Sequence, residues 1–101
     1  MIEACINLNG KRCLLTMDGH ATGSEAVCAG ASAIAYALAG YLLNAGEHLE
    51  TMERNALGSG NARIFCIGDE SVQAAFHMAG IGLAQLAQQY PEYIKAVYLE
   101  E

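Results

Sequence analysis

The stretch AVCAGASAIAYALAGYLLNAG, residues 26–46, contains no charged side chain and lies between Glu25 and Glu47. Its length suits a membrane span, since a span needs about 20 apolar residues. Its chemistry does not, because Ala and Gly dominate it and neither flank has a Lys or Arg anchor. We therefore expect no membrane segment but a core helix over about residues 24–44, so apolar that it needs cover on more than one side.

Both ends of this helix carry recognisable signals. Thr22 and Ser24 are candidate N-caps, and Thr22-x-x-Glu25 has the spacing of a capping box. Glu25 also lies where the helix dipole favours a negative charge. Gly46 is placed to terminate the helix.

A hairpin is predicted before the helix. Residues 2–8, IEACINL, alternate between apolar and polar positions, as a half-buried strand does. Asn9-Gly10 follows and predicts a type I′ turn. This turn would place Ile6 opposite Cys13, Ala4 opposite Leu15 and Ile2 opposite Met17, so that both strands turn one apolar face the same way.

A second hairpin is predicted after the helix. Residues 48–57 are compatible with helix or strand, but the turn at residues 58–61 and the strand-like ARIFCI at residues 62–67 favour a hairpin. The first of these strands is polar, so at least one of its faces is expected to contact water.

The remaining chain predicts a second long helix and a last strand. Asp69 or Ser71 caps the helix SVQAAFHMAGIGLAQLAQQY, and Pro91 stops it. Residues 93–99, YIKAVYL, form the strand. The expected order is ββα-ββα-β in a single α+β domain over residues 1–101, with a mixed or antiparallel sheet packed with two long helices.

Charge and length limit the classes of partner. Five Lys and Arg against eleven Asp and Glu give a formal net charge of −6, so no direct contact with nucleic acid is expected. A chain of 101 residues can bury only a modest core, which favours a homodimer with a shared apolar interface. Glu3 near the start and the lack of a basic region argue against a signal peptide.

The four cysteines lie at positions 5, 13, 28 and 66, and no two have C-x-x-C spacing. We therefore expect neither a metal site nor a cofactor. Cys13 and Cys66 lie in apolar strands and are interpreted as small buried hydrophobic residues. Cys5 and Cys13 should face opposite sides of the sheet and not bridge. Reduced thiols favour a cytoplasmic location.

Cys28 differs because it lies in the first turn of a helix, where unpaired amides and the dipole stabilise a thiolate. The preceding loop carries His20, and Gly19 and Gly23 allow that loop to fold back. An imidazole beside the thiol would make an activated nucleophile. The alternative is a buried cysteine and a solvated loop histidine. His48 and His77 are interpreted as structural.

A family resemblance bears on these alternatives. Gly19-His20-Ala21, then Glu25-Ala26-Val27-Cys28-Ala29, then Ser32, resembles the signature of the Prp ribosomal-processing cysteine proteases. The element order and the length are similar to that family over essentially the whole chain. The resemblance implies Cys28 as nucleophile, His20 as general base and Ser32 as a supporting residue. Glu25 stands where the family typically has Asp. Glu25 and Gly19 are, with Ser32, the residues expected to support the catalytic pair.

The resemblance also implies a substrate and a setting. Members of the family are homodimeric cytoplasmic proteases that remove a short N-terminal extension from the ribosomal protein L twenty-seven. Phage-encoded relatives are thought to trim capsid or scaffold proteins. The loop between His20 and Cys28 is shorter here than in the ribosomal-processing members, which leaves the phage-type substrate open. A dimeric peptide-binding module without catalysis is a further alternative.

The resemblance implies acyl transfer through a covalent thioester. We expect amides near Val27 to Ala29 to hold the oxyanion. The strand at residues 48–57 and the loop at residues 19–24 are candidates for lining a groove that takes an extended peptide.

Overall fold

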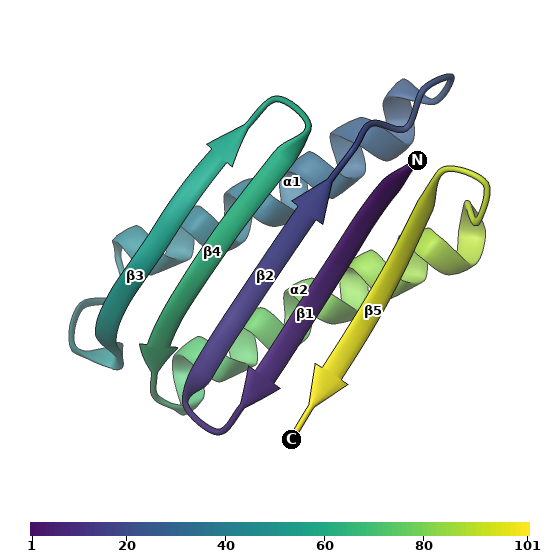
Figure 1. The fold of residues 1–101 in the computed structure, drawn as a ribbon. Coiled ribbons are helices and arrows are strands. Elements are labelled where there is room, and N and C mark those ends of the chain that lie inside the picture. Colours follow the sequence, from purple (N-terminus) through teal and green to yellow (C-terminus); the bar gives the residue numbers. More distant parts are fainter.

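Five strands form one mixed sheet, and both helices cover the same face of it (Figure 1). The computed structural model describes residues 1–101. In chain order the elements are β1 (Ile2–Asn9), β2 (Arg12–Asp18), α1 (Glu25–Leu43), the 3-10 turn η1 (Gly46–His48), β3 (Leu49–Gly58), β4 (Asn61–Gly68), α2 (Glu70–Gln89) and β5 (Ile94–Glu100). This confirms the α+β class, the ββα-ββα-β order and the two long helices expected from the sequence.

The strand order across the sheet is β3-β4-β2-β1-β5. The two hairpins lie side by side because β2 pairs antiparallel with β4, and β5 adds to β1 as the only parallel pair. α1 lies against β3, and α2 lies across β1 and β5 (Figure 1). The β2–β4 pairing matters most for function, since it brings the end of β2 beside the β3–β4 turn.

The first hairpin has a different register from the one expected. Ile6 lies opposite Leu15, not Cys13, and Ala4 lies opposite Met17, so the expected pairs are wrong by two residues. The turn is made by Gly10 and Lys11, with a positive φ of +59° at Gly10 only. Positive φ at the first turn position alone fits a type II′ turn, whereas type I′ needs it at both. An even shift keeps every side chain on its expected face.

The core lies between the sheet and the two helices. It consists of 23 buried hydrophobic residues, and no polar or charged residue is buried. Phe76 of α2 is fully buried among them together with Leu15 and Ile64 from the central strands. The four alternating positions of β1 that the sequence pattern assigned to one face, Ile2, Ala4, Ile6 and Leu8, are all buried.

The cysteines of the strands behave as expected. All four cysteines are free thiols. Cys13 and Cys66 are buried and lie opposite one another across β2 and β4, whereas Cys5 is half-buried on the other face. The neighbouring Cys13 sulfur and burial raise the pKa of Cys66. Cys66 is therefore an inert, protonated core residue.

The N-cap of α1 is Ser24, whose Oγ accepts the Val27 N–H at 3.3 Å. The capping box between Thr22 and Glu25 does not form, because the helix starts two residues after the box requires. α1 ends at Leu43, and Gly46, with φ +58°, begins η1. The helix boundaries thus agree with the expected ones to within a residue at each end.

α1 is covered by the sheet and, along one flank, by α2, where Gly30 lies against Leu86 and Ile34 against Gly82. Its buried residues are Val27, Ala31, Ala35, Leu38, Ala39 and Leu42. By length and composition alone it could cross a membrane, with a mean hydropathy of 1.7, a test that core helices also pass. This chain provides no cover for the opposite side, where Tyr36 and Leu43 are exposed.

Asp69 caps α2, which settles the choice between Asp69 and Ser71. Its Oδ1 accepts the N–H groups of Ser71 at 2.9 Å and Val72 at 3.4 Å. Its Oδ2 lies 2.7 Å from Nδ1 of His48. The hydrogen bond from His48 lowers the pKa of Asp69, and the two backbone N–H groups lower it further. His48 therefore joins η1 to α2, in keeping with the structural role predicted for it.

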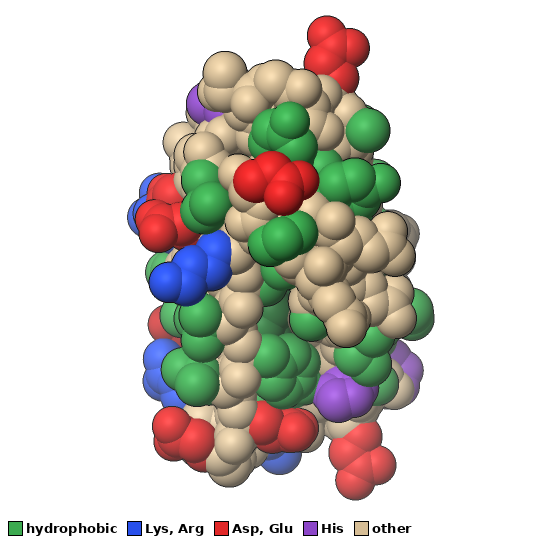
Figure 2. Space-filling view, turned by 90° about the vertical axis from the view of Figure 1, so that its right-hand side faces the viewer, with side chains coloured by type: hydrophobic (Ala, Val, Ile, Leu, Met, Phe, Trp, Pro, Cys, Tyr) green, Lys and Arg blue, Asp and Glu red, His purple; other side chains and the backbone are tan.

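Charge is distributed unequally between the two layers. All five basic residues, Lys11, Arg12, Arg54, Arg63 and Lys95, belong to strands or to the first hairpin turn. Figure 2, seen from the β5 side, shows Lys and Arg side chains along the sheet side and hydrophobic side chains across the helical layer. The only Asp, Glu, Lys or Arg residues of the two helices are Glu25 and Glu70, each in the first turn, so the rest of both helices has none.

Candidate active site

The loop between β2 and α1 folds back on the start of the helix. Gly19 has φ +97°, and a Cβ there would collide with the Met1 carbonyl oxygen, so only glycine fits. The Ser24 N–H donates to the Ala21 carbonyl at 2.9 Å and closes the loop. Ala21 is buried, whereas the neighbouring His20 side chain is exposed. The loop thus presents an imidazole at the N-terminal end of α1.

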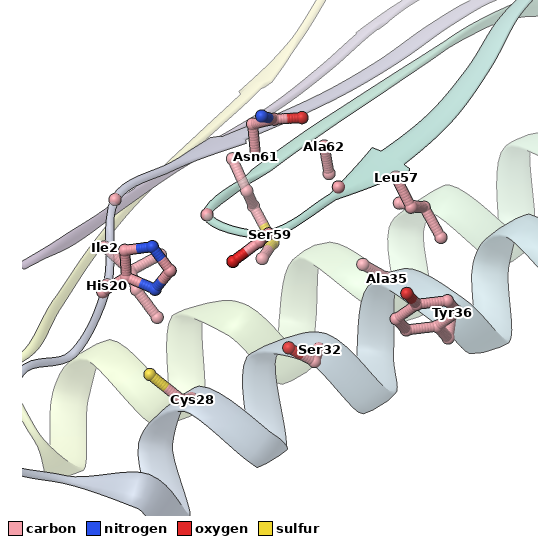
Figure 3. A pocket seen from close by; sticks show the side chains of 14 residues that line it. Ile2, His20, Cys28, Ser32, Ala35, Tyr36, Leu57, Ser59, Asn61 and Ala62 are labelled. Atoms are coloured by element: carbon pink, nitrogen blue, oxygen red, sulfur yellow. The ribbon is translucent and has the colours of Figure 1, made fainter.

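Cys28 is half-buried in the first turn of α1 and faces this loop. Its Sγ accepts a hydrogen bond from the Ala21 N–H at 3.2 Å. His20 and Cys28 line the same two cavities, of about 410 and 570 Å³. Figure 3 shows the sulfur directed into the space beneath the His20 ring. No hydrogen bond joins the two side chains here, and such bonds often tighten only when substrate binds.

The other residues singled out from the sequence lie on either side of this pair. Ser32, one turn after Cys28, lines the cavity of 410 Å³ (Figure 3). Glu25 lines the cavity of 570 Å³ but makes no hydrogen bond to His20. The structure therefore brings Cys28, His20, Ser32, Glu25 and Gly19 to one end of the molecule. The Glu25 carboxylate does not orient the imidazole in this state.

The cavity wall that faces α1 differs from the one predicted from the sequence. The cavity of 410 Å³ is lined by the end of β3 and the β3–β4 turn, residues 57–62, rather than by the length of residues 48–57 (Figure 3). On the helix side it runs along one stripe of α1, from Cys28 past Ser32 to Tyr36. The turn is distant in sequence, and no local pattern shows that β4 pairs with β2.

The expected donors for an oxyanion are also corrected. The Val27 N–H already donates to Ser24 Oγ, and the Cys28 N–H donates to the Ser24 carbonyl at 3.3 Å. Both N–H groups are already hydrogen-bonded at the N-terminus of α1. They are therefore not free to donate to a substrate carbonyl. A backbone donor that does face the sulfur is the Ala21 N–H, from the loop rather than from the helix.

The remaining histidine lies away from this end. His77 Nδ1 forms a hydrogen bond with the Tyr98 hydroxyl, and the two rings meet edge-on with centroids 5.5 Å apart. Like His48, His77 has a hydrogen-bond partner that explains its place in the fold without a catalytic role. No group of three or more His, Cys, Asp or Glu side chains is arranged to hold a metal ion.

Comparison with known proteins places this geometry in context. Residues 1–95 match a family model described as cysteine protease Prp. Comparison with curated proteins gave no significant match. The family match covers both the loop with His20 and the helix start with Cys28.

Solved structures share the fold. A Staphylococcus aureus ribosomal processing protease Prp, in complex with a covalently linked product peptide, is 24% identical, with a TM-score of 0.77 over 97% of this chain and 99% of that one. The same protease with a substrate peptide is 23% identical, with a TM-score of 0.70 over the same shares. A Streptococcus mutans protein is 22% identical, with a TM-score of 0.74 over 100% of this chain and 96% of that one.

Proposed function

The chain belongs to the Prp family of cysteine proteases, and on that premise we propose that it removes the N-terminal extension of a ribosomal protein of the L twenty-seven type. The observation that carries the proposal is the convergence of His20 and Cys28 on the same cavities at the start of α1. The similar Staphylococcus aureus protein is a ribosomal processing protease, which supports the choice of substrate.

The chemistry follows from the two side chains. His20 takes the Cys28 thiol proton, and the thiolate attacks the scissile carbonyl carbon, forming a C–S bond and an oxyanion. The Ala21 N–H, which donates to the Cys28 sulfur at 3.2 Å, stabilises the thiolate before the attack. The imidazolium then protonates the leaving amine as the C–N bond breaks. Water hydrolyses the thioester and restores the thiol.

The cavity between α1 and the β3–β4 turn is where the peptide lies in this proposal. It has a volume of about 410 Å³ and extends along α1 from Cys28 to Tyr36. Tyr36 and Leu57 supply apolar surface, and Ser32 and Ser59 supply hydroxyl groups. A groove with both kinds of group suits an extended peptide, whose backbone needs partners and whose side chains need apolar contact.

Cleavage of a defined precursor tests the substrate. The purified protein is incubated with the full-length ribosomal protein precursor encoded in the same genome, and the products are analysed by mass spectrometry. We expect a single cut that releases the N-terminal extension. An intact ribosomal precursor together with a cleaved phage capsid or scaffold protein would overturn the substrate but leave the chemistry. If the protein cleaves neither the ribosomal precursor nor the phage protein, the assignment of this site as a protease site is overturned.

We also propose a homodimer that buries the outer surface of the helices. Met78 and Leu43 are 71% and 77% exposed, and an uncharged groove of about 820 Å³ lies between α1 and α2. Such apolar surface is more typical of an interface than of a monomer. The free thiols support a reducing compartment such as the cytoplasm.

Sedimentation equilibrium is expected to show a dimer that Leu43→Asp converts to a monomer. Val97→Asp is the matched control, because Val97 is 43% exposed on the uncovered face of the sheet. A monomeric wild-type protein would contradict the dimer. Equal dissociation by Leu43→Asp and Val97→Asp would contradict an interface formed by the helices.

A further inference from the structure

His20 rests on the turn between β3 and β4. The last residues of the β2–β4 ladder are Asp18 and Asn61, which lie opposite one another. One residue further on, the Gly19 N–H donates to the Gly60 carbonyl at 2.9 Å. The backbone immediately before His20 is therefore tied to the turn by a hydrogen bond that extends beyond the sheet.

The His20 ring itself lies against Gly60. A Cβ at Gly60 would lie 2.5 Å from Nε2 of His20, 3.0 Å from Cε1 and 3.2 Å from Cδ2. These distances are too short for the ring to stay where it is beside a side chain, so glycine leaves room for the imidazole in this position. The ring has no hydrogen bond to any other residue, and it lies over the position that a side chain of residue 60 would occupy. Figure 3 shows the ring beside this turn, on the side of the cavity opposite α1.

Arg63 fixes the same junction from β4. Its guanidinium donates to both carboxylate oxygens of Asp18, at 2.9 and 3.0 Å, and to the Met17 carbonyl at 3.2 Å. Both bonds to Asp18 come from one nitrogen, Nη2, while Nη1 reaches the Met17 carbonyl, so the guanidinium holds both residues at once. The end of β2, where the His20 loop begins, is thereby locked to the strand that follows the turn.

We propose that the β3–β4 turn is the positioning element for the general base, and that Gly60 is a positioning residue for His20. This inference rests on the proposed function, in which His20 deprotonates Cys28. An imidazole held in place before substrate arrives avoids the cost of ordering it in the transition state. The glycine permits close contact, and the Arg63–Asp18 pair keeps the turn and the loop in register.

Gly60→Ala tests the proposal, with Gly10→Ala as its matched control. Both glycines have positive φ, +75° and +59°, and both lie in two-residue hairpin loops, but Gly10 has open space around it. Both substitutions therefore put a side chain at a positive φ in a hairpin loop, and only Gly60→Ala also displaces the ring. We expect Gly60→Ala to lower kcat by about 10²-fold with KM little changed, since a shift of about 1 Å in a catalytic group costs that much. Gly10→Ala should retain wild-type kcat.

Two measurements separate this proposal from the function on which it rests. The His20 ring resonances in NMR spectra report its position whether or not it is catalytic, and Gly60→Ala alone should shift them. The rate of Cys28 alkylation by iodoacetamide as a function of pH reports its chemical role. If His20→Ala leaves alkylation and cleavage unchanged, the proposed function fails. The NMR spectra of Gly60→Ala then still decide whether Gly60 positions the His20 ring.

Arg63→Lys gives an independent variant should Gly60→Ala not fold. Lysine keeps the charge but cannot bond both Asp18 oxygens and the Met17 carbonyl together. We expect a smaller loss in kcat and a smaller shift of the His20 resonances than with Gly60→Ala. Arg12→Lys is the control, since Arg12 pairs with Glu53 at 3.5 Å on the surface of the sheet. Unchanged His20 resonances in both Gly60→Ala and Arg63→Lys, or equal shifts in the two controls, would overturn the proposal.

Discussion

Replacement of Cys28 by alanine is expected to lower kcat/KM for the ribosomal precursor by about 10⁴-fold or more, as removal of a catalytic nucleophile does elsewhere. No other thiol can take its place, since Cys13 and Cys66 are buried and Cys5 lies on the sheet. The measurement is precursor cleavage with purified protein, followed by mass spectrometry.

Cys28→Ser separates chemistry from stability. Alanine leaves the Ala21 N–H without the sulfur that accepts its hydrogen bond at 3.2 Å, whereas a serine hydroxyl can still accept. The serine variant should therefore fold as wild type and still be inactive. Cys5→Ala, which removes the other half-buried thiol, should keep activity. Cleavage by both Cys28 variants at the wild-type rate would exclude this residue as the nucleophile.

Replacement of His20 by alanine is expected to lower kcat/KM by about 10²- to 10⁴-fold, the usual contribution of a general base. The same substitution should slow alkylation of Cys28 by iodoacetamide at neutral pH, because the thiol would lose its proton acceptor. Thermal stability should change little, since the ring is exposed and makes no hydrogen bond. Activity, alkylation and the melting temperature are measured on the same preparation.

His48→Ala is the matched control for this second prediction. His48 is also exposed, but it pairs with Asp69 at 2.7 Å at the start of α2, away from the cavity. It should lower the melting temperature, because the cap of α2 loses a partner, and leave activity unchanged. The opposite result, an active His20→Ala and an inactive His48→Ala, would place the base elsewhere.

Much of the site could be predicted because it is local. Ser24 caps α1, and Cys28 follows four residues later, so a single helix start positions both the sulfur and the loop that faces it. The donor to that sulfur could not be predicted in the same way. Ala21 N–H reaches Cys28 only because the Gly-containing loop folds inward and buries Ala21, a conformation that no spacing rule specifies.

Two errors of the sequence interpretation concern the way strands pair. The turn at Asn9-Gly10 was placed one residue early, because Asn-Gly favours one hairpin turn while the strand faces allow another register two residues away. The groove was assigned to the whole of residues 48–57, whereas the cavity is lined by residues 57–62. The first choice is between two registers of one local hairpin, whereas the second depends on the pairing of β4 with β2, which is distant in sequence.

The sequence by itself determined the elements of this protein, the capped start of the Cys28 helix and the faces that each strand buries, because these follow from periodicity and capping within a few residues. Only the tertiary structure decided that β4 lies beside β2, and thus that Gly60 lies under His20. The physical reason is that strands of similar apolar pattern can pair in several orders. The order is selected by the joint burial of 23 core residues drawn from the whole chain.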